Sequence, residues 1–456
     1  MARNRTAYLA VVGATLVAVG CTASARIVEG EEEISGPSAP SSPSSPTAPS
    51  PSGDAALAVV DASPPGDAGS TVIPGTSFAA GVLGAGAGGT GAPRPERSGL
   101  LALPGGGVGG PVLTSNNPEI FTGDGVLYAN VPSPTRGGTS YPLSGDFGIY
   151  VHHINQAGTT KWVSILVTNP NASDVTVSLR GSGYSQDETG GLALGASPDY
   201  RVSKEWIEGT PRTDTGTITI APGKGAVLWA SSAGQNREID ARFAVKASAA
   251  VRVYIVATSD GSLQKSLDAS QPIVDAPGEY LRSGNPPPPF GREAGIYRHD
   301  TWRSTFDVEV PDGPKHVAFM VNTATGGGLS QVQAFPALTH YDVSAREAVG
   351  MYGNVYDVDL GLRNTVSPAA ARRVRVAFHS LANGTASRWW DGAALVDGNP
   401  LDVRHVPGNE TTTLFDGVLA PGETRRLRFR AMVPGLAAIP QALSVETFGA
   451  LADGGP

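Results

Sequence analysis

Residues Trp162–Arg180 read WVSILVTNPNASDVTVSLR, and this stretch predicts the fold. Apolar, mostly β-branched residues recur at every second position in both arms, which is the period of a strand with one buried face. Between the arms, Asn169-Pro170-Asn171 supplies a turn, because proline presets φ and asparagine tolerates left-handed backbone. We therefore predict a β-hairpin that belongs to a β-sandwich.

The second half of the chain repeats this pattern. Tyr356–Asn364 reads YDVDLGLRN, a proline-containing turn follows, and Arg373–His379 alternates again. Asn364 follows Asn169 by 195 residues. An Ala-Pro-Gly turn precedes an apolar strand in each half, and Pro421 of the second turn follows Pro222 of the first by 199 residues. Two signatures at nearly one spacing favour two tandem modules. Chance is the alternative, because both turns occur in many β-sandwiches.

Composition indicates an all-β protein. The 456 residues include 59 glycines and 37 prolines, and only 16% are charged, which indicates many turns and few long amphipathic helices. From Pro111 onward, short alternating runs lie between turn residues, and no window shows a convincing helical stripe. The net charge of −8 argues against a nucleic-acid partner, which requires a basic face.

We predict two tandem β-sandwich (Ig-like) modules, residues 111–285 and 291–452. Four consecutive prolines, Pro286–Pro289, mark the boundary, because each fixes φ and disfavours a helix. A long surface loop within one larger fold is the alternative. The strands expected in the first module are Val126–Val131, Phe147–Ile154, Trp162–Thr168, Val175–Arg180, Thr217–Ile220, Ala226–Trp229, Ala241–Lys246 and Val251–Ala257.

The N-terminus has the features of an export signal. A short basic region precedes the apolar run Tyr8–Val19, which is too short to span a bilayer but suits a secretory signal. The run ends at the one cysteine of the chain, Cys21, and small residues before a lone cysteine resemble the bacterial lipoprotein signal, in which the cysteine is diacylated. We predict a signal peptide at residues 1–20 and a membrane-binding lipid on Cys21. Ala18 stands where such signals usually have leucine, and an ordinary secreted protein is the alternative.

Residues 21–110 are expected to form a disordered tether. Ser35–Gly53 contains almost only serine, proline, alanine, threonine and glycine, and glycine-rich runs continue to Gly110. Such segments bury too little apolar surface to offset chain entropy. A flexible chain of about 90 residues has a reach of roughly 50 Å. A folded body that begins near Pro111 would therefore stand off the membrane.

The body from Pro111 to Phe448 resembles a family of exported bacterial proteins, mostly cyanobacterial, classed as domain of unknown function 3370. The resemblance rests on Leu113–Glu119, Gly125–Leu127, Phe147–Ile154, Trp162–Arg180, Gln331–Pro336 and Gly353–Tyr356. It implies export and one continuous body. It implies no catalytic residues, and it does not include the tether or the signal.

Polar residues with metal-binding chemistry occur at two places. His152 and His153 are adjacent in an expected strand, so they face opposite sides and cannot both bind one ion. One inward, hydrogen-bonded histidine and one surface histidine is the simpler interpretation. Asp357 and Asp359 share a strand face and have the oxygens that Ca²⁺ prefers, but Arg363 on that face favours a solvated outer surface. We therefore predict no metal ion and no cofactor.

Trp389 and Trp390 are the candidate binding residues. Aromatic side chains in a loop can stack on sugar rings or anchor a protein partner. The alternative places one tryptophan in the core and the other over it. No Gly-x-Ser-x-Gly and no His-Glu-x-x-His pattern occurs, so we assign no catalytic residue.

These features predict a lipid-anchored, exported protein of the cell envelope with a non-catalytic binding or structural role. Its expected partners are the membrane, through the lipid, and an envelope protein or glycan. The alternative is an envelope hydrolase that acts on glycan or peptide between the modules, which should show a deep pocket with convergent acids or histidines. A component of a larger surface assembly is a third interpretation, with strand-edge pairing as its signal.

We predict that Cys21→Ala releases the protein from the membrane fraction, because each buried acyl CH₂ group contributes about 0.8 kcal/mol to membrane binding. Detergent phase partitioning of the variant and the unaltered chain measures this. An unchanged distribution would contradict the anchor.

Overall fold

The computed structural model describes residues 71–83, 94–280, 291–322, 333–365, 370–382 and 389–450. Every described residue belongs to one compact unit, Pro65–Pro456. The expected signal peptide, Cys21 and the prolines of 286–289 lie outside the described residues. Within the described ranges, no helix combines the length and the apolar character needed to cross a bilayer.

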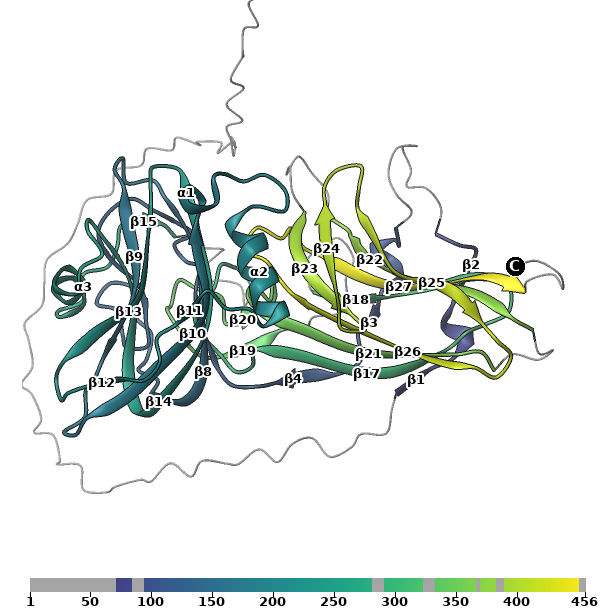
Figure 1. Ribbon diagram of the computed structural model, residues 1–456, viewed down its shortest axis with the longest axis horizontal. Helices are drawn as coiled ribbons and strands as arrows, with labels where there is room; N and C mark the ends of the chain where they lie inside the picture. Colours follow the sequence, from purple (N-terminus) through teal and green to yellow (C-terminus); the bar gives the residue numbers. More distant parts are fainter. Residues whose placement is uncertain are drawn as a thin grey trace, which may run out of the picture. The chain divides into compact units, whose positions relative to one another are not determined.

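Strands dominate the described residues (Figure 1), which confirms the predicted all-β class. The largest sheet has 14 strands and surrounds one hydrophobic core. Its strands are β5 (Val112–Ser115), β6 (Ile120–Phe121), β7 (Gly125–Ala129), β8 (Leu143–Asn155), β9 (Lys161–Thr168), β10 (Val175–Ser185), β11 (Thr213–Asp214), β12 (Ile218–Ile220), β13 (Gly225–Ala233), β14 (Arg237–Thr258), β15 (Gly278–Glu279), β16 (Ala294–Tyr297), β19 (Phe335–His340) and β20 (Glu347–Ala348).

Two smaller sheets share a second hydrophobic core. The first contains β1 (Thr71–Ile73), β4 (Gly106–Val108), β17 (Thr301–Glu309), β21 (Val355–Arg363), β23 (Trp390–Val396), β24 (Asn399–His405) and β26 (Thr424–Met432). The second contains β2 (Ala79–Ala80), β3 (Leu101–Ala102), β18 (Pro314–Met320), β22 (Arg372–Ser380), β25 (Thr411–Leu419) and β27 (Gln441–Ala450). Strands from beyond the predicted module boundary at residues 285–291 join the largest sheet, since β16, β19 and β20 belong to it.

Strand β14 connects the layers around the first core. Its first part pairs with β8 and β10, and its second part pairs with β7 and β9, on either side of a register irregularity. Side chains from both parts, such as Phe243 and Ile255, lie in the same core. The two strands predicted at Ala241–Lys246 and Val251–Ala257 are therefore parts of one irregular strand.

The predicted hairpin at Trp162–Arg180 is an arch between layers. In the described structure β9 pairs with β13 and the second part of β14, whereas β10 pairs with β11, β12 and the first part of β14. Its counterpart behaves in the same way, because β21 and β22 belong to different sheets. The hairpin prediction is wrong because alternation indicates which side chains face inward and not which strand is the hydrogen-bonded neighbour.

An asparagine holds each arch to an Ala-Pro-Gly turn. The side chain of Asn169 donates a hydrogen bond to the carbonyl oxygen of Ile220 at 2.8 Å, and that of Asn364 donates to the carbonyl oxygen of Leu419 at 3.0 Å. The glycine of each turn donates its N–H to the carbonyl oxygen of the same asparagine, at 3.0 and 2.9 Å. The two signatures found in the sequence thus contact each other in both halves, as a duplication predicts.

Short helices occur in the region where no sequence window showed a convincing helical stripe. The described residues include α1 (Gln186–Thr189), α2 (Pro198–Glu208), α3 (Leu263–Ser270) and the short 3₁₀ turns Gly75–Ser77 and Arg97–Gly99. Helix α2 begins after Ser197, whose Oγ accepts a hydrogen bond from the N–H of Tyr200 at 3.2 Å, and it ends at Gly209 with φ of +70°. A serine cap, a proline in the first turn and a terminal glycine are ordinary helix signals.

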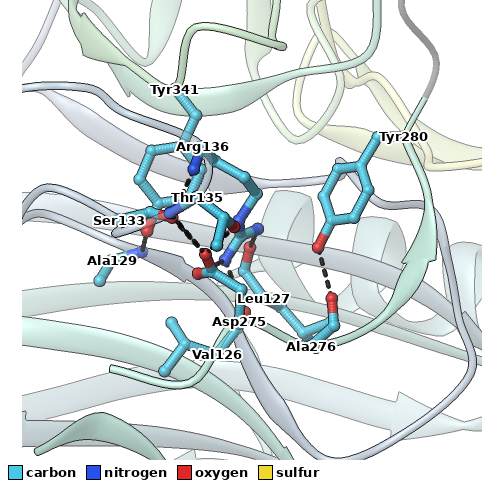
Figure 2. Close-up of polar contacts among 10 residues, drawn as sticks. All are labelled: Val126, Leu127, Ala129, Ser133, Thr135, Arg136, Asp275, Ala276, Tyr280 and Tyr341. Atoms are coloured by element: carbon cyan, nitrogen blue, oxygen red, sulfur yellow. Dashed lines mark hydrogen bonds and ion pairs between the residues drawn. The ribbon is translucent and has the colours of Figure 1, made fainter. Parts of the chain in front are cut away.

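Arg136 connects β7 to the segment that contains Asp275 (Figure 2). Its guanidinium donates to the carbonyl oxygens of Leu127 and Val126 at 2.5 and 2.7 Å and pairs with Asp275 at 2.5 Å. The ring of Tyr341 lies 4.5 Å from the guanidinium carbon. Burial alone would raise the pKa of Asp275, but hydrogen bonds from Arg136 and two neighbouring hydroxyls lower it. A buried arginine with this many partners is structural.

The folded body begins before Pro111. Strands β1 and β4 pair with β17, and β2 and β3 pair with β18. Phe78 and Leu103 belong to the second hydrophobic core, and Leu100 lies in a small cluster beside it. The described parts of residues 71–110 are therefore not tether, which corrects the predicted boundary. Each of these strands is only two or three residues long. An alternating pattern cannot be recognised over so few residues in a low-complexity segment.

We predict that a chain beginning at Pro111 is much less stable than one beginning at Pro65. Removing Phe78, Leu100 and Leu103 exposes their contacts, at about 2 kcal/mol for each side chain. Urea unfolding of the two chains measures the difference. Equal midpoints with equal slopes would show that β1–β4 do not contribute.

Candidate functional site

A row of polar side chains lies on the outer face of β8 and β14. Asp240 is the cross-strand partner of His152, and Arg242 is the partner of Tyr150. Glu238 shares the face with Asp240, because residues two apart on a strand point the same way. The intervening residues of both strands belong to the first hydrophobic core.

Helix α2 covers this row. The helix contacts β10 and β14 and also β23 and β26, and it lies between these strands (Figure 1). It brings Asp199 to the row, and His152, Asp199 and Glu238 are only 1%, 1% and 2% exposed. Among the described residues, a ring nitrogen of His152 and one carboxylate oxygen of each acid lie within 4.8 Å of one another. Imidazole and carboxylate groups at this separation have the chemistry of a metal centre.

Hydrogen bonds to β23 fix the start of α2. Ser197 donates its hydroxyl to Asp391 at 2.8 Å, and the N–H of Gly195 donates to the same carboxylate at 2.9 Å. One turn further along, the hydroxyl of Ser203 accepts from the N–H of Ala393 at 3.1 Å. These bonds join the start of α2 to β23, so they fix the position of Asp199 in the first turn of the helix.

Asp240 orients the two side chains opposite it. Its Oδ1 accepts a hydrogen bond from the hydroxyl of Tyr150 at 2.8 Å and lies 3.3 Å from Nδ1 of His152. Burial lowers the pKa of His152, but the hydrogen bond to Asp240 and the charges of Asp240 and Asp199 outweigh burial and raise it. Burial, with the same two charges, raises the pKa of Tyr150 well above its usual value. Because a carboxylate oxygen accepts hydrogen bonds, we assign the proton of this contact to Nδ1 of His152.

Two glycines let the main chain approach this cluster closely. A Cβ on Gly435 would lie 2.3 Å from Nδ1 of His152 and 2.8 Å from Oδ1 of Asp199. A Cβ on Gly353, whose φ is +72°, would lie 2.3 Å from the ring of Tyr150. Both glycines belong to the second half of the chain, so the cluster is closed by segments that are distant in sequence.

Arg242 lies at the edge of the cluster. Its Nε donates to the carbonyl oxygen of Gly353 at 2.9 Å, and its guanidinium lies 3.8 Å from the carboxylate of Asp300. The ring of Trp206 on α2 lies 4.4 Å from the guanidinium carbon. Burial lowers the pKa of Arg242 to about 10. The charge of Arg242 is therefore engaged by Gly353, Asp300 and Trp206.

The two adjacent histidines face opposite sides, as predicted. His153 points inward, where Nδ1 lies 2.7 Å from the carbonyl oxygen of Pro118 and Nε2 lies 2.8 Å from Oγ of Ser115. Burial lowers the pKa of His153 to about 3, so the ring is neutral. The expectation that the other histidine lies at the surface is wrong, because α2 covers His152.

The candidate binding pair Trp389 and Trp390 is buried. The two residues are 5% and 0% exposed, and Trp390 lies in the second hydrophobic core with its ring against Phe378. The guanidinium of Arg94 lies 5.6 Å from the ring of Trp389. The prediction of an exposed aromatic loop is therefore corrected, and the observed burial is that of the alternative considered for this pair.

Asp357 and Asp359 lie in a row of ion pairs. Asp359 pairs with Arg426 at 2.8 Å, and Asp357 lies 3.5 Å from Arg303. Arg363 and Arg426 both contact Asp307 on β17. Arginines thus neutralise these carboxylates, which favours the outer surface over a Ca²⁺ site.

A groove opens on the uncovered part of the same outer face. Lys246 lies opposite Ser178 on one side and opposite Asp146 on the other, and Arg180 lies opposite Ala244. The groove has a volume of about 350 Å³. Its lining residues are Gly110, Asp146, Phe147, Ser178, Arg180, Ala244, Val245, Lys246 and Asp300.

Sequence reasoning missed both this groove and the acids around His152. The acids are 47 or more residues from His152 along the chain, so no local spacing joins them. The available signal was the charged, alternating start of β14, where Glu238 and Asp240 interrupt a strand that should be apolar on both faces if fully buried.

Residues 100–191 and 263–386 match a family model described as "Protein of unknown function (DUF3370)". The matched segments include His152 but not Asp199, Glu238 or Asp240. No curated protein matches the chain.

Two solved structures illustrate the structural similarity. The PBSX exported protein XepA is 8% identical, with 67% of this chain and 84% of that chain covered and a TM-score of 0.14. The N-terminal CBM22-1–CBM22-2 tandem domain of Xyn10C from Paenibacillus barcinonensis is 8% identical, with 72% and 92% covered and a TM-score of 0.14. At this TM-score neither similarity supports a conclusion about this chain.

We predict that Gly353→Ala lowers the free energy of unfolding by about 3 kcal/mol. A left-handed alanine costs about 1 kcal/mol, and overpacking against Tyr150 adds about 2 kcal/mol. Gly313→Ala is the matched control, because Gly313 has φ of +78° and nothing within 4 Å of its Cβ position. The control should lose only the cost of a left-handed alanine, about 1 kcal/mol. Equal losses in urea unfolding would contradict the close contact with Tyr150.

Proposed function

We propose that this chain, whose residues 100–191 and 263–386 match the model of the family of unknown function DUF3370, is an exported envelope protein that a lipid on Cys21 holds at a membrane and that binds an envelope glycan without cleaving it. The N-terminal pattern supports export and the anchor: a short apolar run that ends at the one cysteine. The groove on β8, β10 and β14 supports the binding role.

The groove is the single observation on which the binding proposal rests. Its volume of about 350 Å³ is within the usual range of ligand sites, about 300 to 1,000 Å³. Arg180, Lys246 and Asp146 are exposed at its surface, where charged groups form strong hydrogen bonds with hydroxyl groups. The small residues Ser178 and Ala244 leave room for an extended chain between them.

A glycan suits this surface better than a protein. Protein interfaces bury about 1,200 to 2,000 Å² around an apolar centre that is depleted of charge. The exposed side chains of the groove, Arg180, Lys246 and Asp146, are charged. A sugar polymer presents many hydroxyl groups along a narrow chain, so it can use such a strip of mixed charge.

The alternative, a hydrolase with a site between the modules, is best represented by the cluster at His152. General acid–base catalysis requires side chains within hydrogen-bonding distance of the substrate. His152, Asp199 and Glu238 are at most 2% exposed, so a polymer could reach them only after α2 had moved. The binding function therefore requires no movement of α2, whereas the hydrolase function requires such a movement.

Co-sedimentation with purified, insoluble cell-wall glycan tests the proposal. We expect the protein to bind and the double variant Arg180→Glu/Lys246→Glu to bind at least about tenfold more weakly, since tenfold corresponds to only about 1.4 kcal/mol. Arg303→Glu/Arg428→Glu is the charge-matched control, because these two side chains are 61% and 78% exposed on β17 and β26, outside the groove.

Absence of sedimentation, or equal loss in the control, would overturn the glycan proposal. Soluble sugar released into the supernatant would establish the hydrolase instead. Retention of Cys21-dependent membrane binding in the groove variant separates failure of the binding role from failure of the anchor.

A further inference from the structure

The cluster at His152 contains more negative than positive charge. Asp199, Glu238 and Asp240 contribute three carboxyl groups, and each is at most 2% exposed. Nδ1 of His152 lies 3.3 Å from Asp240 and 3.8 Å from Asp199. Arg242 is next on the same face, but its guanidinium contacts Gly353, Asp300 and Trp206. Buried charges in proteins are paired or coordinate metal ions, because an isolated ion loses its hydration.

The unused atoms of the cluster identify a place for a cation. Nε2 of His152 is buried and has no hydrogen-bond partner among the described residues, and the same holds for Oδ2 of Asp240. A nitrogen of His152 and an oxygen from each of Asp199 and Glu238 lie within 4.8 Å of one another. Ligand atoms that surround a Zn²⁺ ion at 2.0–2.2 Å are separated by about 3 to 4 Å, so a small contraction brings these atoms into coordination.

The hydrogen bond of His152 has the form found beside metal ions. A metal-bound histidine usually donates its other ring N–H to a carboxylate, which fixes the tautomer and the ring orientation. Here Nδ1 lies 3.3 Å from Oδ1 of Asp240, and Tyr150 holds that same oxygen at 2.8 Å. This arrangement leaves Nε2 as the atom with a free lone pair.

We propose that His152, Asp199 and Glu238 bind a divalent transition-metal ion of the zinc type, with Asp240 as a positioning residue. One nitrogen and carboxylate oxygens suit Zn²⁺ or Mn²⁺, whereas Ca²⁺ takes six to eight oxygens. The ion joins β8 and β14 to α2, and the main chain at Gly435 closes the site from the second half. Its role is structural, because the cluster is buried.

An ion at this position accounts for several features of the surrounding structure. The ion would add positive charge beside three buried carboxyl groups. Gly435 is required because a side chain there would meet Nδ1 of His152 at 2.3 Å. The caps of α2 and its bonds to Asp391 place Asp199 against the ring before any ion binds.

Metal analysis of the full-length chain, purified in detergent without chelator, tests the site. We expect about one zinc-type ion per chain by mass spectrometry. After removal of the ion, titration with Zn²⁺ alone should restore one ion and raise the melting temperature, while Ca²⁺ should not. Failure of the metal-free chain to bind Zn²⁺ or Mn²⁺ would overturn the proposal.

Substitutions assign the ligands. Asp199→Asn and Glu238→Gln should each weaken Zn²⁺ binding at least about tenfold, and Asp240→Asn about 10- to 100-fold as for other groups that orient a ligand. His153→Gln and Glu293→Gln are the controls: one alters the neighbouring histidine and the other a buried acid, 1% exposed, in a different part of the fold. Equal loss in the controls would contradict the assignment.

A spectroscopic measurement keeps the test valid if a variant does not fold. Co²⁺ bound to the unaltered chain should show visible absorption of a nitrogen- and oxygen-ligated ion, and Zn²⁺ should displace it. A Co²⁺ spectrum equal to that of the free ion in buffer would overturn the site, whatever the behaviour of the variants.

Discussion

The structure depends on the two unlike faces of strand β14. Because both edges of β14 are paired, its side chains have only the two faces to occupy. The inner face is apolar and fills the first core with residues such as Ile239 and Phe243. The outer face begins with Glu238, Asp240 and Arg242, which are buried all the same. Burying these charges is unfavourable unless each finds a partner, so the elements that cover this face must supply partners as well as apolar contact.

Helix α2 meets both requirements. Val202 and Ile207 pack with Val355 and Met432 in a small apolar cluster, so the helix contributes burial to the side that faces the second half. Asp199 meets the polar row in the first turn, where the positive end of the helix dipole favours an acid. The helix thus joins two sheets whose facing surfaces are chemically different.

The two arches, at Asn169 and Asn364, are each specified by a few residues. Asn169 and Asn364 each satisfy carbonyl groups of an Ala-Pro-Gly turn, and a buried carbonyl left without a donor costs about 1 to 3 kcal/mol. The turn and the arch therefore need each other, which accounts for the similar spacing of the two signatures in the two halves. An offset that differs by only four residues is what one inserted loop would produce.

The strands could be predicted because a strand with one buried face has apolar residues at every second position. The prediction from sequence placed β9 and β10 well, yet it paired them wrongly, since alternation contains no information about hydrogen-bonded neighbours. It missed β1, which pairs with β17 through Thr71 and Phe306, because the partner is more than 230 residues away and the strand has three residues. It also missed α2, although Ser197 and Gly209 were ordinary cap signals.

The candidate site was beyond prediction for the same reason. His152 was noticed, but Asp199 and Glu238 reach it only through the register of β14 and the caps of α2. The tryptophans illustrate the converse case. Trp389 and Trp390 looked like a binding pair because aromatic residues serve both roles, and only the packing of β23 against Phe378 decides between them.

The covered and open parts of the outer face are physically connected. Lys246 lies on the same face of β14 as Arg242, four residues further along, and it lines the groove. The guanidinium of Arg242 lies 3.8 Å from Asp300, which also lines the groove, and Arg242 holds Gly353 at 2.9 Å. The same arginine thus borders the buried cluster and the groove. Arg242 holds Asp300 at the edge of the groove, and a side chain that is already fixed loses less entropy in any further contact that it makes.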